Sequence, residues 1–386
     1  MKKNPLLKLQ ALGQSVWMDF IRRGTLLSGE LRRLIEEDGL RGMTSNPTIF
    51  EKAIAGSDDY DAAIRALALE GKSVAEMYQA LVVEDIQRAA DLFRPVYDRT
   101  EGRDGFVSLE VSPHLAHDTN GSIEEAHVLW AAVNRPNVMI KIPATQAGLP
   151  TIQQLISEGL NINITLLFGL PRYQQVIEAY LSGLEIRAGH GKPVQAVASV
   201  ASFFLSRIDV LLDPMLENEL RADDPDVETA GALLGQTAIA SAKVAYQIYK
   251  EIFTSARFRK LAAQGARTQR LLWASTSTKN PAYSDVKYVE ALIGPETINT
   301  MPIETLNAYR DHGEPARRLT QRVAEARKMF QYLPDLGFDL EARTQQLEDE
   351  GVQKFIQAFD LLMRALTEKR AAALGKPVDR RTAITT

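Results

Sequence analysis

The chain has 386 residues, of which 45% are hydrophobic and 24% charged, and its formal net charge is −4, so its composition is that of a soluble globular protein without a bias toward nucleic acid or anionic membranes. It contains no cysteine, which excludes disulfides, a thiolate nucleophile and a cysteine-ligated metal. No stretch approaches the ~20 apolar residues of a membrane-spanning helix, and the N-terminal apolar run is interrupted and lacks a cleavage site, so we expect a cytoplasmic protein.

Short strand-like runs alternate with helical patterns along most of the chain. Several of these runs, such as VMIKIPA and INITLLF, are nearly continuously apolar, which is typical of strands buried on both faces of a parallel sheet. The predicted strands, in chain order, are Ser15–Phe20, Gly39–Ser45, Phe106–Ser112, Val138–Ala144, Asn161–Phe168, Val194–Ser202, Leu271–Ser275 and Ile298–Pro302.

Amphipathic segments with helical spacing lie between the predicted strands. They are Leu26–Glu37, Val74–Phe93, Ile123–Val133, Thr151–Ser157 and Tyr173–Leu184, and Asn280–Pro281 is expected to begin another. Eight alternations of a strand with a helix predict an α/β fold, namely a single (β/α)8 TIM barrel. The alternative, a doubly wound open sheet, would need a glycine-rich turn after the first strand, and WMDFIRRGTLLSG offers none.

Two regions exceed a minimal barrel. We expect a helical insertion at 203–265, between the sixth and seventh strands, and a helical C-terminal extension at 315–374. Because no internal repeat or low-complexity linker separates them, we interpret 1–386 as one barrel domain with helical additions.

Side chains at the carboxyl ends of barrel strands converge on one site. Lys141 lies in such a position, between Ile140 and Ile142 in the fourth predicted strand. A lysine there either extends its ammonium group from the strand end or is buried for chemistry, since burial disfavours the charged form and frees the amine to attack a carbonyl.

Other polar residues occupy equivalent positions. Asp19 and Glu110 each end an apolar strand and could act as general acid or base, or simply cap a helix or pair with a lysine. Asn46 precedes a proline and is therefore expected to be extended. Asn163 and Thr165 are two residues apart, so both point to the same side of their strand and either form a buried network or bind a ligand.

Two features suggest phosphate binding. Arg207 lies five residues after Ser202, and the segment from Ser275 to Lys279 (STSTK) follows the seventh strand, where phosphate sites are frequent in this architecture. The alternative for Arg207 is a salt bridge with Asp209 or Glu217.

The histidines offer little evidence for a metal. His114, His117, Asp118 and His127 lack the helical spacing of a zinc motif, and we expect a solvated loop and no metal site.

Five segments together resemble the transaldolases: GMTSNPTIFEKAI, SLEVSPHLAHDT, VMIKIPAT, GLNINITLLF and WASTSTKNPAY. They occur in the family's order over about residues 10 to 312, and the length of the chain resembles one bacterial subgroup. The resemblance implies transfer of a dihydroxyacetone unit between phosphorylated sugars, without a cofactor, in the non-oxidative pentose phosphate pathway. A homodimer is compatible with the long helical extension.

The resemblance also implies a role for each site residue. Lys141 would form the Schiff base, Asp19 would act on the C4 hydroxyl, and Glu110 and Thr165 would hold the catalytic water. The residues expected to bind substrate are Asn46, Asn163 and Ser202 for the dihydroxyacetone unit, Phe204 beside the water, and Arg207 and Ser275 for the phosphate. In one departure from the family pattern, the seventh-strand loop offers Lys279 where an arginine is usual.

Three alternatives remain at this level. An aldolase that releases free dihydroxyacetone would differ only in how the enamine is protonated, although Phe204 favours transfer. A deoxyribose-phosphate aldolase would not explain the TSNPTIF segment. A non-catalytic barrel that binds phosphosugars is the alternative from outside the enzymes.

Overall fold

The computed structural model describes residues 4–220 and 231–375. Eight parallel strands form a closed barrel in chain order, and β8 pairs with β1 to complete it, which confirms the predicted (β/α)8 fold. The strands are β1 (Gln14–Asp19), β2 (Gly42–Thr44), β3 (Phe106–Glu110), β4 (Val138–Pro143), β5 (Ile162–Leu167), β6 (Ser199–Phe204), β7 (Arg270–Ala274) and β8 (Thr297–Met301).

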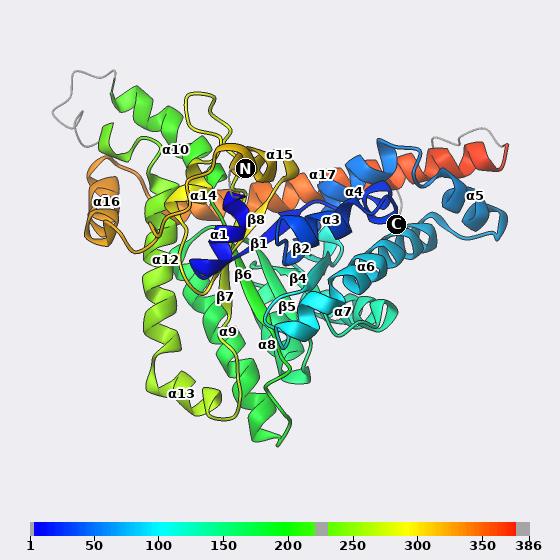
Figure 1. The fold of residues 1–386 in the computed structure, drawn as a ribbon, viewed down its shortest axis with the longest axis horizontal. Helices are drawn as coiled ribbons and strands as arrows, with labels where there is room; N and C mark the ends of the chain where they lie inside the picture. The colour runs from blue at the N-terminus through cyan, green and yellow to red at the C-terminus, as the bar shows by residue number, and fades with distance from the viewer. Residues whose placement is uncertain (1–3, 221–230, 376–386) are drawn as a thin grey trace.

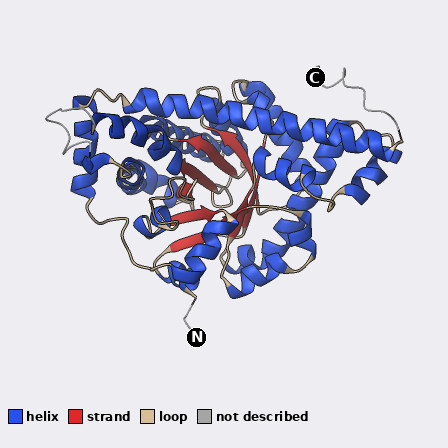
Figure 2. Cartoon of the chain, turned by 90° about the horizontal axis from the view of Figure 1, so that it is seen from above, coloured by secondary structure: helices blue, strands red, loops and turns tan. Residues whose placement is uncertain are grey.

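The strands lie at the centre of the molecule with helices around them (Figure 2). All strand residues except the last of β1 are buried, which explains why the strands read as continuous apolar runs. The helices up to β6 are α1 (Pro5–Ala11), α2 (Arg23–Leu27), α3 (Glu30–Glu37), α4 (Pro47–Ala55), α5 (Asp61–Leu69), α6 (Val74–Arg99), η1 (Pro113–Leu115), α7 (Thr119–Val133), α8 (Gly148–Glu158) and α9 (Leu170–Gly189).

The helices after β6 complete the ring and add to it. They are α10 (Ser206–Glu219), α12 (Thr237–Phe253), α13 (Ala256–Ala262), α14 (Lys287–Ala291), α15 (Ile303–His312), α16 (Val323–Asp335) and α17 (Leu340–Ala373). Within residues 4–220 and 231–375, no helix has both the length and the apolar character needed to cross a membrane.

Three sequence predictions need correction. The helix predicted at Leu26–Glu37 is interrupted at Gly29, whose φ of 84° is incompatible with a continuous helix. The sixth strand begins at Ser199 rather than Val194, because a turn interrupts the apolar run. It also includes Phe203 and Phe204, the first two residues of the predicted insertion. The helix predicted to begin at Pro281 begins at Lys287.

The reason for the third error is local. The Asn280 side chain accepts a hydrogen bond from the Ala282 N–H (2.9 Å), and the Asn280 carbonyl accepts one from Tyr283 (3.1 Å). An asparagine that bonds to its own backbone two residues later favours a turn over a helix. The segment between β7 and α14 is therefore not helical, and it turns at residues 281–282 and 285–286.

The long helix α17 dominates the C-terminal extension. It runs along the molecule beside α4 and α5 (Figure 1, orange to red), and it also packs against α6 and α10. Of the helical additions, α12 contacts β7 and α17 contacts β5, so described parts of both pack on the barrel.

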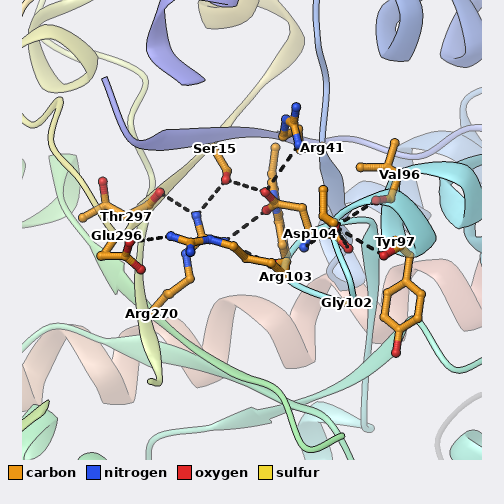
Figure 3. A network of polar contacts seen from close by, with 12 residues as sticks. Ser15, Arg41, Val96, Tyr97, Gly102, Arg103, Asp104, Arg270, Glu296 and Thr297 are labelled. Atoms are coloured by element: carbon orange, nitrogen blue, oxygen red, sulfur yellow. Dashed lines mark hydrogen bonds and ion pairs between the residues drawn. The ribbon is translucent and has the colours of Figure 1, made fainter. Parts of the chain in front are cut away.

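A buried polar network closes the barrel at the amino-terminal ends of the strands (Figure 3). Asp104 accepts hydrogen bonds from Ser15 Oγ (2.7 Å), Trp17 Nε1 (3.2 Å) and Arg270 Nη1 (3.1 Å). The second guanidinium nitrogen of Arg270 donates to Ser15 Oγ and to the Thr297 carbonyl. Asp104 and Arg270 are 4% and 6% exposed, so this network secures the end of the barrel opposite to the one where function is expected.

Candidate active site

A cavity of about 680 Å³ opens at the carboxyl ends of the strands. Its lining comes from strands β1, β2, β4, β6, β7 and β8, and from helices α4, α10, α15 and α17. Eight of the residues predicted for the site line it: Asp19, Asn46, Lys141, Ser202, Phe204, Arg207, Ser275 and Lys279. The other three, Glu110, Asn163 and Thr165, are buried on β3 and β5 next to the strand that carries the lysine.

Lys141 is only 3% exposed. Its Nζ donates a hydrogen bond to the Ser45 carbonyl (3.0 Å) and lies 3.3 Å from Glu110 Oε2, an ion-pair contact that lacks hydrogen-bond geometry. In the barrel, Glu110 is in register with Lys141 and Lys141 with Asn163. Neighbours in register on parallel strands project to the same side, so the three side chains form one polar layer.

Glu110 lies in this layer and is 8% exposed. Burial raises the pKa of its carboxyl to about 7, although the nearby Lys141 ammonium opposes the rise. Glu110 Oε2 and Thr165 Oγ1 are both buried without a hydrogen-bond partner among the residues described. Buried oxygens without a hydrogen-bond partner are unusual and indicate a place where water or a ligand binds.

Asp19 ends β1 at the cavity wall. It accepts a hydrogen bond from Thr44 Oγ1 (2.6 Å), and that hydroxyl is also 2.8 Å from Thr300 Oγ1. Burial raises the pKa of the Asp19 carboxyl, while the charge of Lys141, the Thr44 bond and the charge of Arg207 oppose the rise. Asp19 is thus held in one orientation and is suited to exchanging a proton.

A chain of hydrogen bonds fixes the side-chain amide of Asn163 next to the cavity. Ser202 Oγ donates to Asn163 Oδ1 (2.7 Å), and Asn163 Nδ2 donates to Ser108 Oγ (2.9 Å). Asn163 is fully buried, whereas Ser202 lines the cavity.

Asn46 has the extended backbone that its place before proline predicts, with φ −159° and ψ 170°. Its Oδ1 accepts a hydrogen bond from the Ile49 N–H (3.0 Å) and caps α4. The cap uses the side-chain oxygen of Asn46, and the residue lines the cavity.

One side of the cavity is cationic. Arg207, in the first turn of α10, has its guanidinium carbon 5.5 Å from the centre of the Phe204 ring, and its buried Nη1 has no hydrogen-bond partner among the residues described. Burial lowers the pKa of Arg207 and also that of Lys279, whose pKa is lowered further by the charges of Arg207 and Lys52. The Asp209 carboxylate, one of the two alternative partners of Arg207, bonds to Ala238 and Tyr288 instead.

Sequence reasoning missed several residues that line the cavity. Lys52 adds a cation from α4, Thr300 supports Asp19 through Thr44, and Phe355 reaches the cavity from α17. The sequence could have indicated Lys52, since this lysine lies in the GMTSNPTIFEKAI segment that resembles the family. No sequence pattern indicates Phe355, because a phenylalanine on a long amphipathic helix cannot be distinguished from other core residues.

The histidine cluster does not form. His114 pairs with Asp360 (2.8 Å) and His127 with Glu158 (2.5 Å). In the described ranges 4–220 and 231–375, no group of three or more histidines and carboxylates is arranged to hold a metal ion.

The fold and the cavity define a (β/α)8-barrel protein whose cavity brings together a buried lysine, a carboxylate and a cationic side. The family model described as Transaldolase/Fructose-6-phosphate aldolase matches residues 16–366. The chain is 48% identical over 373 residues to the transaldolase of Trichodesmium erythraeum, and the matched region covers 96% of this chain and 98% of that protein. It is 45% identical over 362 residues to the transaldolase of Saccharopolyspora erythraea, with 94% and 96% covered. The chain belongs to the transaldolase/fructose-6-phosphate aldolase family.

Proposed function

We propose that this protein is a transaldolase that transfers a dihydroxyacetone unit from fructose 6-phosphate or sedoheptulose 7-phosphate to an aldose phosphate, glyceraldehyde 3-phosphate or erythrose 4-phosphate. The observation that carries the proposal is the buried Lys141 amine at the wall of a cavity that also holds Asp19 and a cationic side. Membership of the family supports the same reaction class.

In the first step the Lys141 ammonium group loses a proton, and the resulting amine attacks the C2 ketone of the donor sugar and forms a carbinolamine. Loss of water then gives an iminium ion, which is an electron sink. We assign the proton transfers of this step to a water held by Glu110 Oε2 and Thr165 Oγ1, the two buried oxygens without a partner among the residues described. A carboxyl with a pKa of about 7 can both donate and accept a proton near neutral pH.

In the second step the C3–C4 bond breaks. Asp19 accepts the proton of the C4 hydroxyl, the bonding electrons move into the iminium ion to form an enamine, and an aldose phosphate leaves. Thr44 holds the accepting carboxyl in place. Asn46 and Ser202, with Asn163 behind the serine, bind the hydroxyls of the dihydroxyacetone unit.

The phosphate lies on the cationic side of the cavity. Arg207 supplies a guanidinium whose Nη1 has no partner among the described residues, and Ser275 and Lys279 face it from the segment after β7. Guanidinium groups bind phosphate in a bidentate manner and ammonium groups act as point charges, so a lysine can replace an arginine here with less directional binding.

The alternative within the family is a lyase that releases free dihydroxyacetone, which the family description also names. Phe204 lines the cavity beside Arg207 and favours transfer, because an apolar ring limits the access of water to the enamine. The test is product analysis with fructose 6-phosphate, with and without erythrose 4-phosphate. A transaldolase makes sedoheptulose 7-phosphate only with the acceptor; release of dihydroxyacetone at the same rate without acceptor would identify a lyase.

We further propose a cytoplasmic enzyme that acts as a homodimer. The absence of cysteine is compatible with a reducing compartment. Light scattering of the purified protein decides the oligomeric state, since a monomer would give the 42.8 kDa of one chain.

A further inference from the structure

A buried polar network lies next to the phosphate side of the cavity without lining it. Asp209, on α10, is 1% exposed and accepts two hydrogen bonds of 2.8 Å, from the Ala238 N–H at the start of α12 and from Tyr288 Oη on α14. One turn later on the same helix, Asp213 is 5% exposed.

Asp213 repeats the arrangement. It accepts 2.8 Å hydrogen bonds from the Gly235 N–H, just before α12, and from Tyr283 Oη, just before α14. Lys287 Nζ lies 3.7 Å from Asp209 and 3.4 Å from the centre of the Tyr283 ring. A Cβ at Gly235, whose φ is 65°, would lie 2.5 Å from Tyr283 Oη, so the close approach requires glycine. We call Asp209, Asp213, Tyr283, Lys287 and Tyr288 the polar clamp.

The polar clamp joins the two segments that carry the phosphate-binding groups. Arg207 is two residues before Asp209 in the same helix, and Ser275 and Lys279 lie in the connection that leads to Tyr283. The same segments also meet at the cavity, where Ser206 Oγ is 2.9 Å from Ser275 Oγ. Between the two ends, Thr278 Oγ1 donates to the Ser284 carbonyl (2.7 Å) and holds the connection in a compact turn.

Such a network stabilises a fold inefficiently, because burying charged groups removes them from water. Burial raises the pKa of Asp209 to about 6, raises that of Asp213 and lowers that of Lys287, so the charged forms are disfavoured here. Apolar residues of the same volume commonly stabilise a core as well or better, but they do not fix the relative position of two segments through directed bonds. The costs and the location together argue for a positioning role.

We infer that the polar clamp positions Arg207 relative to Ser275 and Lys279, and thereby sets the affinity of the enzyme for phosphorylated substrates without touching them. This inference rests on the proposed phosphate site. Loosening the polar clamp allows α10 and the connection after β7 to shift, which weakens phosphate binding. The chemistry at Lys141 depends on other strands and continues once the substrate is bound.

The test compares Tyr288→Phe with the control Tyr180→Phe. Tyr180 is also fully buried, and its hydroxyl donates one 2.7 Å bond to the Arg267 carbonyl. Arg267 lies before β7, at the opposite end of that strand from the connection after β7, and both variants lose one hydroxyl bond. Isothermal titration gives the Kd for inorganic phosphate and fructose 6-phosphate, and steady-state kinetics gives kcat and KM. We expect Tyr288→Phe to raise both Kd values and KM about tenfold, as for loss of one hydrogen bond, with kcat within about twofold of wild type.

Unchanged affinity in folded Tyr288→Phe would overturn the inference, as would an equal loss in Tyr180→Phe. If Tyr288→Phe does not fold, Tyr283→Phe carries the same test, because Tyr283 is only half-buried. The outcome is separable from the proposed reaction: wild-type protein that bound fructose 6-phosphate without turning it over would contradict the transaldolase, while the ratio of Kd values would still support or overturn the positioning role.

Discussion

Replacing Glu110 by glutamine tests the electrostatics of the site through stability. Burial raises the pKa of Glu110 to about 7 in the folded protein, against 4.5 for an ordinary glutamate. Between these values the folded state binds more protons than the unfolded state, so the free energy of unfolding falls as pH rises. The loss of stability amounts to ~3 kcal/mol and occurs between about pH 4 and pH 8.

The assay is urea unfolding at several pH values, followed by the fluorescence of the three tryptophans. Wild-type stability should fall by ~3 kcal/mol more than that of Glu110→Gln across this window. Lys141→Met provides the control, because the Lys141 charge opposes the rise of the Glu110 pKa. Without this charge the decline should extend to higher pH. If the wild type and Glu110→Gln show parallel pH dependences, Glu110 does not titrate near neutrality and our account of the catalytic water is wrong.

Three further variants test separate parts of the structure. Arg207→Ala should raise KM for fructose 6-phosphate roughly 10- to 100-fold, the effect of losing hydrogen bonds to a charged group, and an unchanged KM would argue against its phosphate role. Asp104→Ala leaves the Arg270 charge buried and unpaired, so the free energy of unfolding should drop by ~3–5 kcal/mol in urea titrations while kcat is retained. Gly351→Ala places a Cβ 2.8 Å from Leu166 Cδ2 and 3.5 Å from Arg207 Nη1. Thermal unfolding should therefore show a loss of ~1–3 kcal/mol in the free energy of unfolding, and kinetics should show a raised KM. Wild-type values for both would show that α17 adapts to the added methyl group.

The barrel strands could be predicted because both faces of each strand are buried, which leaves an unambiguous apolar run. The same rule produced the error in the sixth strand. Val194 and Val197 are buried residues of a turn, and an apolar run alone does not distinguish a buried turn from a strand. The error at Pro281 arose because a favourable first-turn proline was outweighed by the side-chain bond of Asn280.

The cavity could be predicted where residues follow strands, because the barrel brings all strand ends to one face. Its remaining walls depend on tertiary packing. Phe355 comes from a helix that lies far along the chain from every strand, and its packing across the barrel is not encoded in any local pattern. The polar clamp could not be predicted for the same reason. The sequence suggests Asp209 only as a partner of Arg207, whereas the tyrosine that binds Asp209 lies 79 residues away.

The central claim is that Lys141 forms a Schiff base with the donor sugar. Sodium borohydride reduction in the presence of fructose 6-phosphate, followed by peptide mass spectrometry, tests it most directly, because reduction converts the imine into a stable secondary amine. Our account predicts a dihydroxyacetone-derived adduct on the peptide that contains Lys141, and none in Lys141→Ala. An unmodified Lys141 in folded wild-type protein that binds the sugar would contradict the account.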